Sequence, residues 1–264
     1  MVASLANSTR IVLIIEYDGT RYHGFQLQTD LPTIQSEIEG ALRKLTGEKT
    51  RVMAASRTDA GVYARGQVVS FRTRSSLPLS AFVGGMNHYL AGDIAVKAAS
   101  RANNSFDVRR NAISREYNYY MLNSSTRSPI RRGFSHLVAE NLDIGAMNQA
   151  CQTLIGKHDF ASFVTGDGTG IKSTVRNMHR AEIDREGDMV ALNMVANSFL
   201  PHQVRNTAGS LIKVGSGKMT VDEFHGIVEA KTPGRAGPTA PACGLCLMRI
   251  NYPEPFGEIR DENL

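Results

Sequence analysis

The sequence predicts an α+β protein built from two related βαββαβ halves. β-branched apolar runs typical of strands alternate with segments whose apolar residues recur every three or four positions, as in helices. The same order of segments occurs twice along the chain, with insertions in the second half. A length of 264 residues suits two compact domains, and a hydrophobic content of 42% is enough to build their cores.

The first half predicts one complete unit. Residues 11–17 form an apolar strand closed by the turn pair Asp18-Gly19, and Thr33 is placed to cap a helix that Gly47 ends. Further strands are predicted over residues 51–55, 67–72 and 93–99, and a second helix over residues 79–90. This βαββαβ order is that of the split βαβ, ferredoxin-like unit.

The second half repeats the pattern less regularly. Strands are predicted over residues 115–122, 176–184, 189–196 and 245–252, and helices over 143–155, 203–214 and 221–230, the first capped by Asp143. We expect the boundary near residues 107–111, giving one domain over 1–108 and a second over 109–264. Two loops rich in glycine and polar residues, 165–170 and 234–242, are of the kind that carries function.

The charge is unevenly distributed. The last twelve residues carry four acids and one base, a net −3, which leaves +8 for the rest of a chain whose formal net charge is +5. A basic body favours a polyanionic partner, because phosphates replace bound counterions.

Several other classes find no support. No stretch approaches the roughly 20 apolar residues of a membrane span, and the first ten residues lack the apolar core of a signal peptide, so we expect a cytoplasmic protein. Cys243 and Cys246 have CxxC spacing but enter a predicted strand, which favours structural thiols over metal binding. The histidines show no metal-ligand spacing, and no nucleotide-binding or serine-hydrolase motif is present.

The run Arg57-Thr58-Asp59-Ala60-Gly61 lies between two predicted strands. A carboxylate on such a loop can act as a nucleophile or a general base. The alternative is an Asx-turn, in which Asp59 accepts a hydrogen bond from its own backbone.

Aromatic and basic residues of the second half suggest contact with RNA. Tyr117 and Tyr119 share one face of a predicted strand, with Tyr120 on the other, and exposed aromatics of this kind stack on bases, although half-buried strand residues are the alternative. Arg205 lies at the start of a helix, where it is either functional or a solvated surface arginine. Basic residues that can follow a phosphate backbone, or simply form solvated faces, are Arg109, Arg110, Arg127, Arg131 and Arg132.

These motifs form an ordered series. Its clearest members are Glu16-Tyr17-Asp18-Gly19, His23-Gly24-Phe25-Gln26, Arg57-Thr58-Asp59-Ala60-Gly61-Val62, Gly66-Gln67-Val68, Arg115 with Tyr117, Val204-Arg205-Asn206 and Thr239-Ala240-Pro241-Ala242. Over nearly the whole chain the series resembles the tRNA pseudouridine(38–40) synthases, the TruA family.

The resemblance implies a pseudouridine synthase fold, with two ferredoxin-like halves whose sheets join side by side around a basic cleft. It also implies a homodimer that isomerises uridine at positions 38, 39 or 40 in the anticodon stem-loop of tRNA. It implies no metal and no organic cofactor.

The resemblance further implies roles for single residues. Asp59 attacks the target nucleotide, Tyr117 packs on the uracil, Arg205 pairs with the catalytic carboxylate, and Arg57 helps to hold the nucleotide out of its stem. Other RNA contacts are expected at Arg109, Arg110, Arg115 and His202.

The chain departs from the family pattern at four positions. The family usually has tryptophan where Phe25 stands and histidine where Tyr63 stands. It has arginine or histidine, with methionine, where Pro201 and Gln203 stand, so Pro201 replaces a basic contact.

Two other functions remain as alternatives. A non-catalytic RRM-like RNA-binding protein would share the ferredoxin-like architecture, but its best RNP1 candidate, residues 65–71, has a single aromatic. An aspartate-dependent hydrolase of a small substrate would leave the basic body unexplained.

Overall fold

The computed structural model describes residues 8–165 and 170–253, which form an α+β fold divided into two units. Unit 1 comprises Met1–Ile113 and Leu247–Leu264, and unit 2 comprises Ser114–Cys246. The division after residue 108 that the sequence suggested therefore falls at Ile113 instead. Residues 247–253 belong to unit 1, although the sequence placed them in the second domain.

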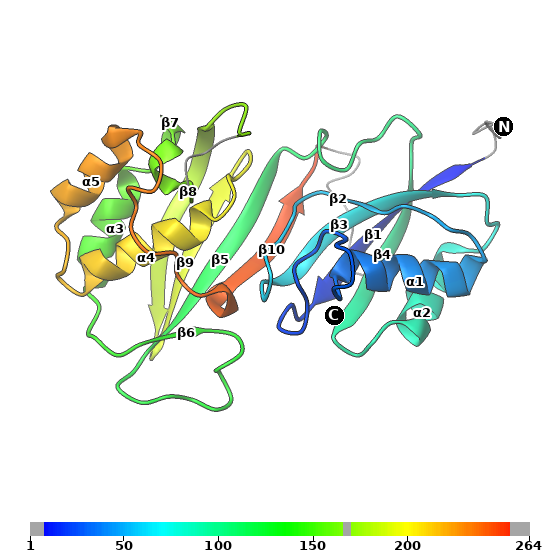
Figure 1. Cartoon of the computed structure of the whole chain (residues 1–264), viewed down its shortest axis with the longest axis horizontal. Helices are drawn as coiled ribbons and strands as arrows, with labels where there is room; N and C mark the ends of the chain where they lie inside the picture. The colour runs from blue at the N-terminus through cyan, green and yellow to red at the C-terminus, as the bar shows by residue number, and fades with distance from the viewer. Residues whose placement is uncertain (1–7, 166–169, 254–264) are drawn as a thin grey trace. The chain divides into compact units, whose positions relative to one another are not determined.

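Unit 1 has the expected ferredoxin-like order. Its elements are β1 (Thr9–Tyr17), α1 (Ile34–Thr46), β2 (Met53–Ala54), β3 (Tyr63–Thr73), α2 (Leu79–Tyr89) and β4 (Ile94–Ala102). The strands follow the order β4-β1-β3, with β2 also paired to β3, and every one of these pairs is antiparallel. Helices α1 and α2 lie on one face of this sheet (Figure 1).

Local chemistry sets the limits of α1. Thr33 caps it by accepting a hydrogen bond from the Ser36 backbone N–H, and Gly47 ends it in the left-handed region at φ 75°. A Cβ on Gly85 of α2 would lie 2.6 Å from a methyl carbon of Leu45. The second glycine of Gly84-Gly85 thus lets α1 and α2 pack closely.

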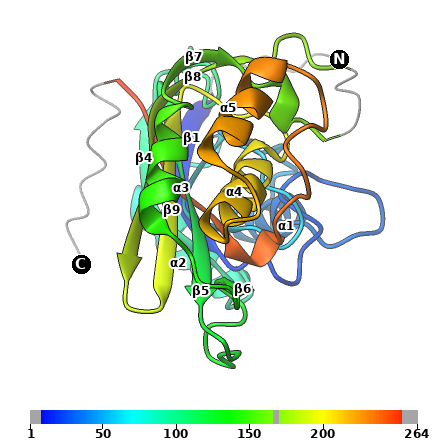
Figure 2. The ribbon, with the colours of Figure 1, turned by 90° about the vertical axis from the view of Figure 1, so that its left-hand side faces the viewer.

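Unit 2 is built around antiparallel strands in the order β5-β9-β8-β7, with β6 parallel to β5. Its elements are β5 (Ser114–Asn123), β6 (His136–Val138), α3 (Ile144–Gln152), β7 (Gly156–Asp159), β8 (Val175–Glu186), β9 (Met189–Ala196), α4 (Gln203–Gly215) and α5 (Val221–Ala230). Helix α3 packs on β8 and against α4 and α5 (Figure 2). Strand β10 (Leu245–Asn251) begins in unit 2 and ends in unit 1.

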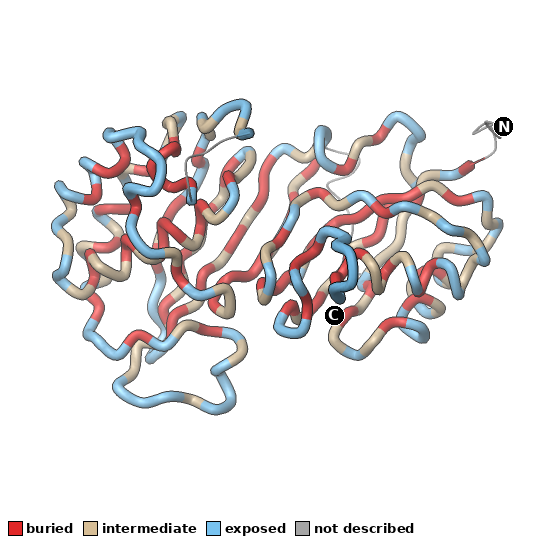
Figure 3. The backbone as a smooth tube through the Cα atoms, in the orientation of Figure 1, coloured by how far each residue is buried: buried red, intermediate tan, exposed pale blue. Residues whose placement is uncertain are grey.

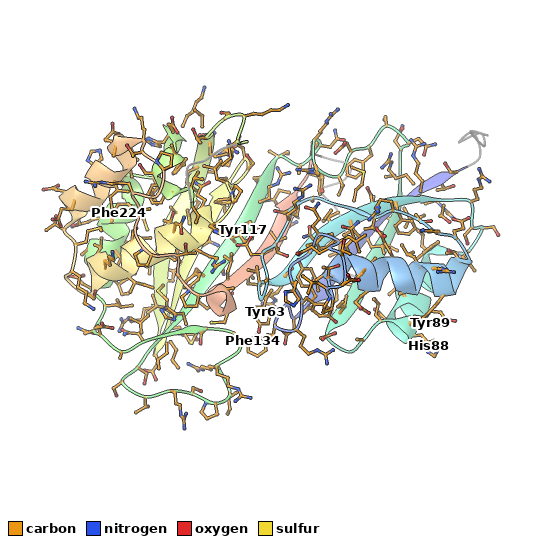
Figure 4. The ribbon with its side chains drawn as sticks, viewed as in Figure 1. Tyr63, His88, Tyr89, Tyr117, Phe134 and Phe224 are labelled. Carbon is orange, nitrogen blue, oxygen red and sulfur yellow. The ribbon has the colours of Figure 1, made fainter. Side chains whose placement is uncertain are left out.

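Each unit encloses its own core, which Figure 3 shows as buried strands and inward helix faces. In unit 2, Phe163 lies 6.0 Å from Phe160 and 6.1 Å from Phe224 between ring centroids, and all three rings are fully buried. Phe224 is labelled in Figure 4.

Within the part of the chain that the structure describes, none of the helices has the length and apolar character of a membrane span.

The predicted elements are present, with differences at short or edge strands. Strand β2 is shorter than the expected 51–55, β3 begins earlier than residue 67, and β6 and β7 were not predicted. β6 and β7 are three and four residues long, too short to show a period. Of the glycine-rich loop expected over 165–170, residues 166–169 lie outside the described part of the chain.

Candidate active site

The loop that carries Asp59 connects β2 to β3 in unit 1. Within it, Arg57 and Ala60 are exposed, Asp59 is half-buried and Thr58 is buried. The Val62 backbone N–H donates to the Asp59 carbonyl at 3.2 Å, which closes a tight turn, and Gly61 adopts φ 75° in that turn. Side chains therefore alternate between solvent and core along this segment, and the carboxylate keeps partial access to solvent.

A buried polar network lies beneath the loop. The hydroxyl oxygens of Tyr17 and Thr58 are 2.8 Å apart and share a hydrogen bond. The side-chain amide of Gln67, which is fully buried, donates to the Ser56 carbonyl at 2.7 Å and lies 3.4 Å from the Tyr17 hydroxyl. The residues on both sides of Arg57 are thus tied to β1 and β3 by side-chain bonds.

The segment after β1 holds the same loop through its backbone. The Phe25 N–H donates to the Thr58 carbonyl at 3.0 Å, and the Gly61 N–H donates to the Tyr22 carbonyl at 3.3 Å. Gly24 has φ 88°, and a Cβ there would lie 2.8 Å from the Thr58 carbonyl oxygen. Gly24 therefore permits a contact that a larger residue would block.

Asp93 fixes that segment in turn. Its carboxylate accepts a hydrogen bond from the Tyr22 hydroxyl at 2.7 Å and forms an ion pair with Arg21 at 2.7 Å. Burial, together with the carboxylate acceptor, raises the pKa of Tyr22 to about 12, so this phenol stays protonated and donating at neutral pH.

Arg205 lies in the first turn of α4 in unit 2. Its Nε donates to the Ala240 carbonyl at 2.8 Å, and the Ala240 N–H donates back to the Arg205 carbonyl at 3.2 Å. The glycine-rich loop expected over 234–242 therefore holds this arginine. Arg205 is not simply a solvated surface residue.

Asn206, the next residue of α4, also holds the 234–242 loop against this helix. Its buried side chain accepts a hydrogen bond from the Thr239 hydroxyl at 2.6 Å and donates to the Phe163 carbonyl at 2.8 Å. Three segments distant in sequence thus meet at one amide, directly beside Arg205. Neither Asn206 nor Gln67 was singled out from sequence as a positioning residue. The sequence signal that could have indicated them was a polar residue within a run of mostly apolar residues, because a buried polar group needs a hydrogen-bond partner.

Tyr117 and Tyr119 of β5 make different contacts. Tyr119 is fully buried and donates its hydroxyl to the Pro241 carbonyl at 2.9 Å, and burial raises its pKa. Tyr117, which Figure 4 labels, is 5% exposed. It packs edge-to-face on Phe199, with ring centroids 5.2 Å apart. Both rings are therefore buried, and neither is the exposed aromatic that the sequence suggested. The packing of Tyr117 on the uracil stays a prediction.

The other expected RNA contacts differ in exposure. Arg109 and Arg110 are exposed, and their backbone N–H groups bond Asp107, which lowers the pKa of that carboxyl. Arg115 is buried at 9% exposure and donates to the Asn197 carbonyl at 2.7 Å, a structural bond. His202 is half-buried, and its Nδ1 lies 2.9 Å from the Thr165 hydroxyl.

The four departures from the family pattern sit in structured surroundings. Phe25 is buried, 6.4 Å from the Tyr17 ring, and the Tyr63 hydroxyl bonds Thr20. Gln203 is fully buried and accepts a hydrogen bond from the Leu200 N–H at 2.9 Å, whereas Pro201 is exposed.

The cysteines are free thiols. Cys151 and Cys246 are buried, and Cys243 is partly buried with its Sγ 3.7 Å from the Ser135 carbonyl. Within residues 8–165 and 170–253, no group of three or more histidine, cysteine or acidic residues is arranged to hold a metal ion.

Comparison with known proteins decides the family. The sequence pattern of the family described as tRNA pseudouridine synthase matches residues 13–110 and 150–253. The chain belongs to this family. Among its relatives, a "tRNA pseudouridine synthase A" of Pelobacter propionicus is 43% identical over 92% of this chain and 99% of its own.

Further relatives agree with this membership. Proteins of the same name from Legionella pneumophila (strain Lens) and Neisseria meningitidis serogroup C (strain 053442) are 40% and 39% identical. They cover 96% and 97% of this chain, and the same shares of their own lengths. The first matched segment, residues 13–110, contains Asp59, and the second, residues 150–253, contains Arg205.

Proposed function

We propose that this protein isomerises uridine to pseudouridine in tRNA, at positions 38, 39 or 40 of the anticodon stem-loop, as a cytoplasmic homodimer. The observation that carries the proposal is the 43% identity to a tRNA pseudouridine synthase A over nearly the full length of both chains. The anticodon positions, the cytoplasmic location and the dimer rest on the resemblance described above.

The reaction suits a loop that bears a single carboxylate. The bond from ribose C1′ to uracil N1 breaks, the base turns, and C1′ bonds to C5; the C5 proton is lost to water and N1 gains one. We assign Asp59 as the carboxylate that starts this sequence, either by attack on the nucleotide or by removal of a sugar proton. Its half-buried position, above the Tyr17, Thr58 and Gln67 network, supports the assignment because a catalytic group must be both reachable and held.

Arg205 and Tyr117 complete the assignment. A guanidinium keeps a nearby carboxylate ionised and oriented. The bond from Arg205 Nε to the Ala240 carbonyl fixes the position of this side chain. Tyr117 offers an aromatic ring to the uracil, on a strand that fixes its position.

The stem-loop contacts follow from exposure. A paired base must be extruded before its ribose can react, which costs a few kcal/mol that backbone contacts offset. The exposed Arg57, Arg109 and Arg110 suit such contacts. Arg115 and His202 are better suited to shaping the site, because each already makes a bond within the protein.

The RRM alternative is not favoured. An RRM presents aromatic residues of its central strands to RNA. In β3, Phe71 is buried at 2% exposure and packs against Phe82 of α2, with ring centroids 5.8 Å apart. The only aromatic of the RNP1 candidate is therefore a core residue.

Release of tritium from tRNA labelled at uracil C5 tests the proposal. We expect the purified protein to release label from a transcript with uridine at position 39 and to form pseudouridine there. A matched transcript with cytidine at 38, 39 and 40 should release none. Tight tRNA binding without tritium release would instead favour the RNA-binding alternative.

A further inference from the structure

Residues 124–135 form a long loop between β5 and β6 that the proposed catalytic site does not use. The loop extends from the end of β5 away from the helices of unit 2 (Figures 1 and 2). We call it the arginine loop, because its charged residues are Arg127, Arg131 and Arg132.

The base of the loop is ordered by its own bonds. The Asn123 side chain donates to the Val138 carbonyl at 3.0 Å, and the Ser124 N–H donates to the same oxygen at 3.2 Å. On the far side, the Ser135 hydroxyl donates to the Arg131 carbonyl at 3.0 Å. Compact loops with joined ends are often functional.

The charges of the arginine loop are uncompensated. All three arginines are exposed, and no aspartate or glutamate occurs from Asn123 to Ala139. Within the described part of the chain, none of their guanidinium groups forms an ion pair, whereas Arg180 of β8 pairs with both Glu116 and Glu182.

Apolar side chains alternate with these charges. Ile130 is 86% exposed and Phe134 is 57% exposed, the two largest exposures among the large apolar residues of the described chain (Figure 4 labels Phe134). The Phe134 N–H donates to the Arg131 carbonyl at 3.0 Å, which joins the backbones of these two residues in a turn. Guanidinium groups bind phosphates, and an exposed aromatic ring can stack on a base or pack on a ribose. The two kinds of group in one loop therefore suit RNA.

We infer that the arginine loop is a second RNA contact, which binds the phosphate backbone of the tRNA at a place separate from the target nucleotide. The inference rests on the proposed function. Tyr117 and Asn123 lie six residues apart on β5, which at about 3.3 Å per residue separates them by roughly 20 Å. The loop therefore contacts tRNA several base pairs away from the nucleotide that reacts.

The triple variant Arg127→Gln/Arg131→Gln/Arg132→Gln tests the inference. Its matched control is Lys157→Gln/Lys172→Gln/Lys231→Gln, which removes three exposed charges elsewhere in unit 2. We expect the arginine variant to bind full-length tRNA about tenfold more weakly, with the slope of log Kd against log salt reduced by about 2 to 3. KM should rise in proportion, with kcat at saturating tRNA within twofold of wild type, and the control should lose much less affinity.

An isolated anticodon stem-loop contains the target nucleotide but lacks the part of the tRNA that the arginine loop is proposed to bind. Wild type and the arginine variant should therefore bind it equally. A loss of affinity no larger than that of the control, or an equal loss on the isolated stem-loop, would overturn the inference. So would conversion of a wild-type dimer to monomers by Ile130→Ser/Phe134→Ser in sedimentation, which would make the loop a subunit contact. If the wild type bound tRNA without releasing tritium, the proposed function would fail, while these binding measurements would still decide the role of the loop.

Discussion

At the scale of single residues, the Asp59 loop depends on polar groups that sequence reasoning did not assign. The hydroxyls of Tyr17 and Thr58 and the amide of Gln67 are buried and bonded to one another or to the loop backbone. A buried polar group without a partner costs about 1 to 3 kcal/mol, so loss of one member should affect the others.

Tyr17→Phe is the smallest test of that network. It removes one hydroxyl and keeps the ring, so we expect a loss of about 1 kcal/mol or more in unfolding free energy. Because the loop would be less well positioned, kcat should fall roughly tenfold with little change in KM. Tyr89→Phe, at an exposed tyrosine of α2, is the control for a lost hydroxyl. Denaturant unfolding and steady-state kinetics measure both effects; an unchanged kcat for Tyr17→Phe would show that the network serves stability alone.

At the scale of elements, the start of α4 is joined closely to the loop that follows α5. A Cβ on Gly209 would overlap the Pro238 carbonyl oxygen, so this glycine lets the loop pass near enough for Ala240 to bond Arg205. Backbone contact of this kind fixes the position of the Arg205 side chain.

Gly209→Ala should therefore push the loop away from α4. We expect a loss of roughly 1 to 3 kcal/mol in stability and a fall in kcat as Arg205 loses its anchor. Gly226→Ala in α5 is the matched control, since a Cβ there meets nothing within 4 Å, and it should stabilise the helix by about 0.5 to 1 kcal/mol. Melting temperatures and turnover numbers distinguish the two; equal behaviour of both variants would contradict the packing argument.

Elements with strong local signals were predictable. The cap at Thr33, the stop at Gly47 and the cap at Asp143 are all present, because each depends on residues within one turn of the helix. The two-residue β2 and the early start of β3 were not predictable, because pairing partners distant in sequence determine them.

At the scale of the whole molecule, the same distinction holds for the site. The sequence indicated Asp59, Tyr117 and Arg205 through the family motifs, and their proposed roles remain predictions. It did not indicate that Arg115 is buried against Asn197 or that Gln67 supports the loop, since both facts arise from contacts across strands. Composition likewise gave no sign that residues 247–253 belong to unit 1.

Charge at this scale makes a separate prediction. The net charge of +5 includes an acidic end, so the rest of the chain is more basic than the total suggests. Each phosphate neutralised by the protein releases counterions, so we expect log Kd for tRNA to rise with log salt with a slope of about 0.7 to 0.9 per contact. Filter binding between low and moderate salt measures this; a slope near zero would contradict binding through the phosphate backbone.

The most direct test of the central assignment is pseudouridine formation by Asp59→Asn. Asparagine keeps the size of the side chain and an oxygen that can accept an Asx-turn bond, but it removes the charge and the nucleophile. Asp143→Asn is the matched control, because this aspartate caps α3 by accepting from the Ala146 N–H at 2.9 Å and asparagine caps equally well.

With saturating tRNA, we expect the Asp143→Asn enzyme to match the wild type. The Asp59→Asn enzyme should fold and bind tRNA as the wild type does, yet release no tritium from uracil C5 and form no pseudouridine. Measurable pseudouridine formation by the folded Asp59→Asn enzyme would contradict the assignment of Asp59 as the catalytic carboxylate.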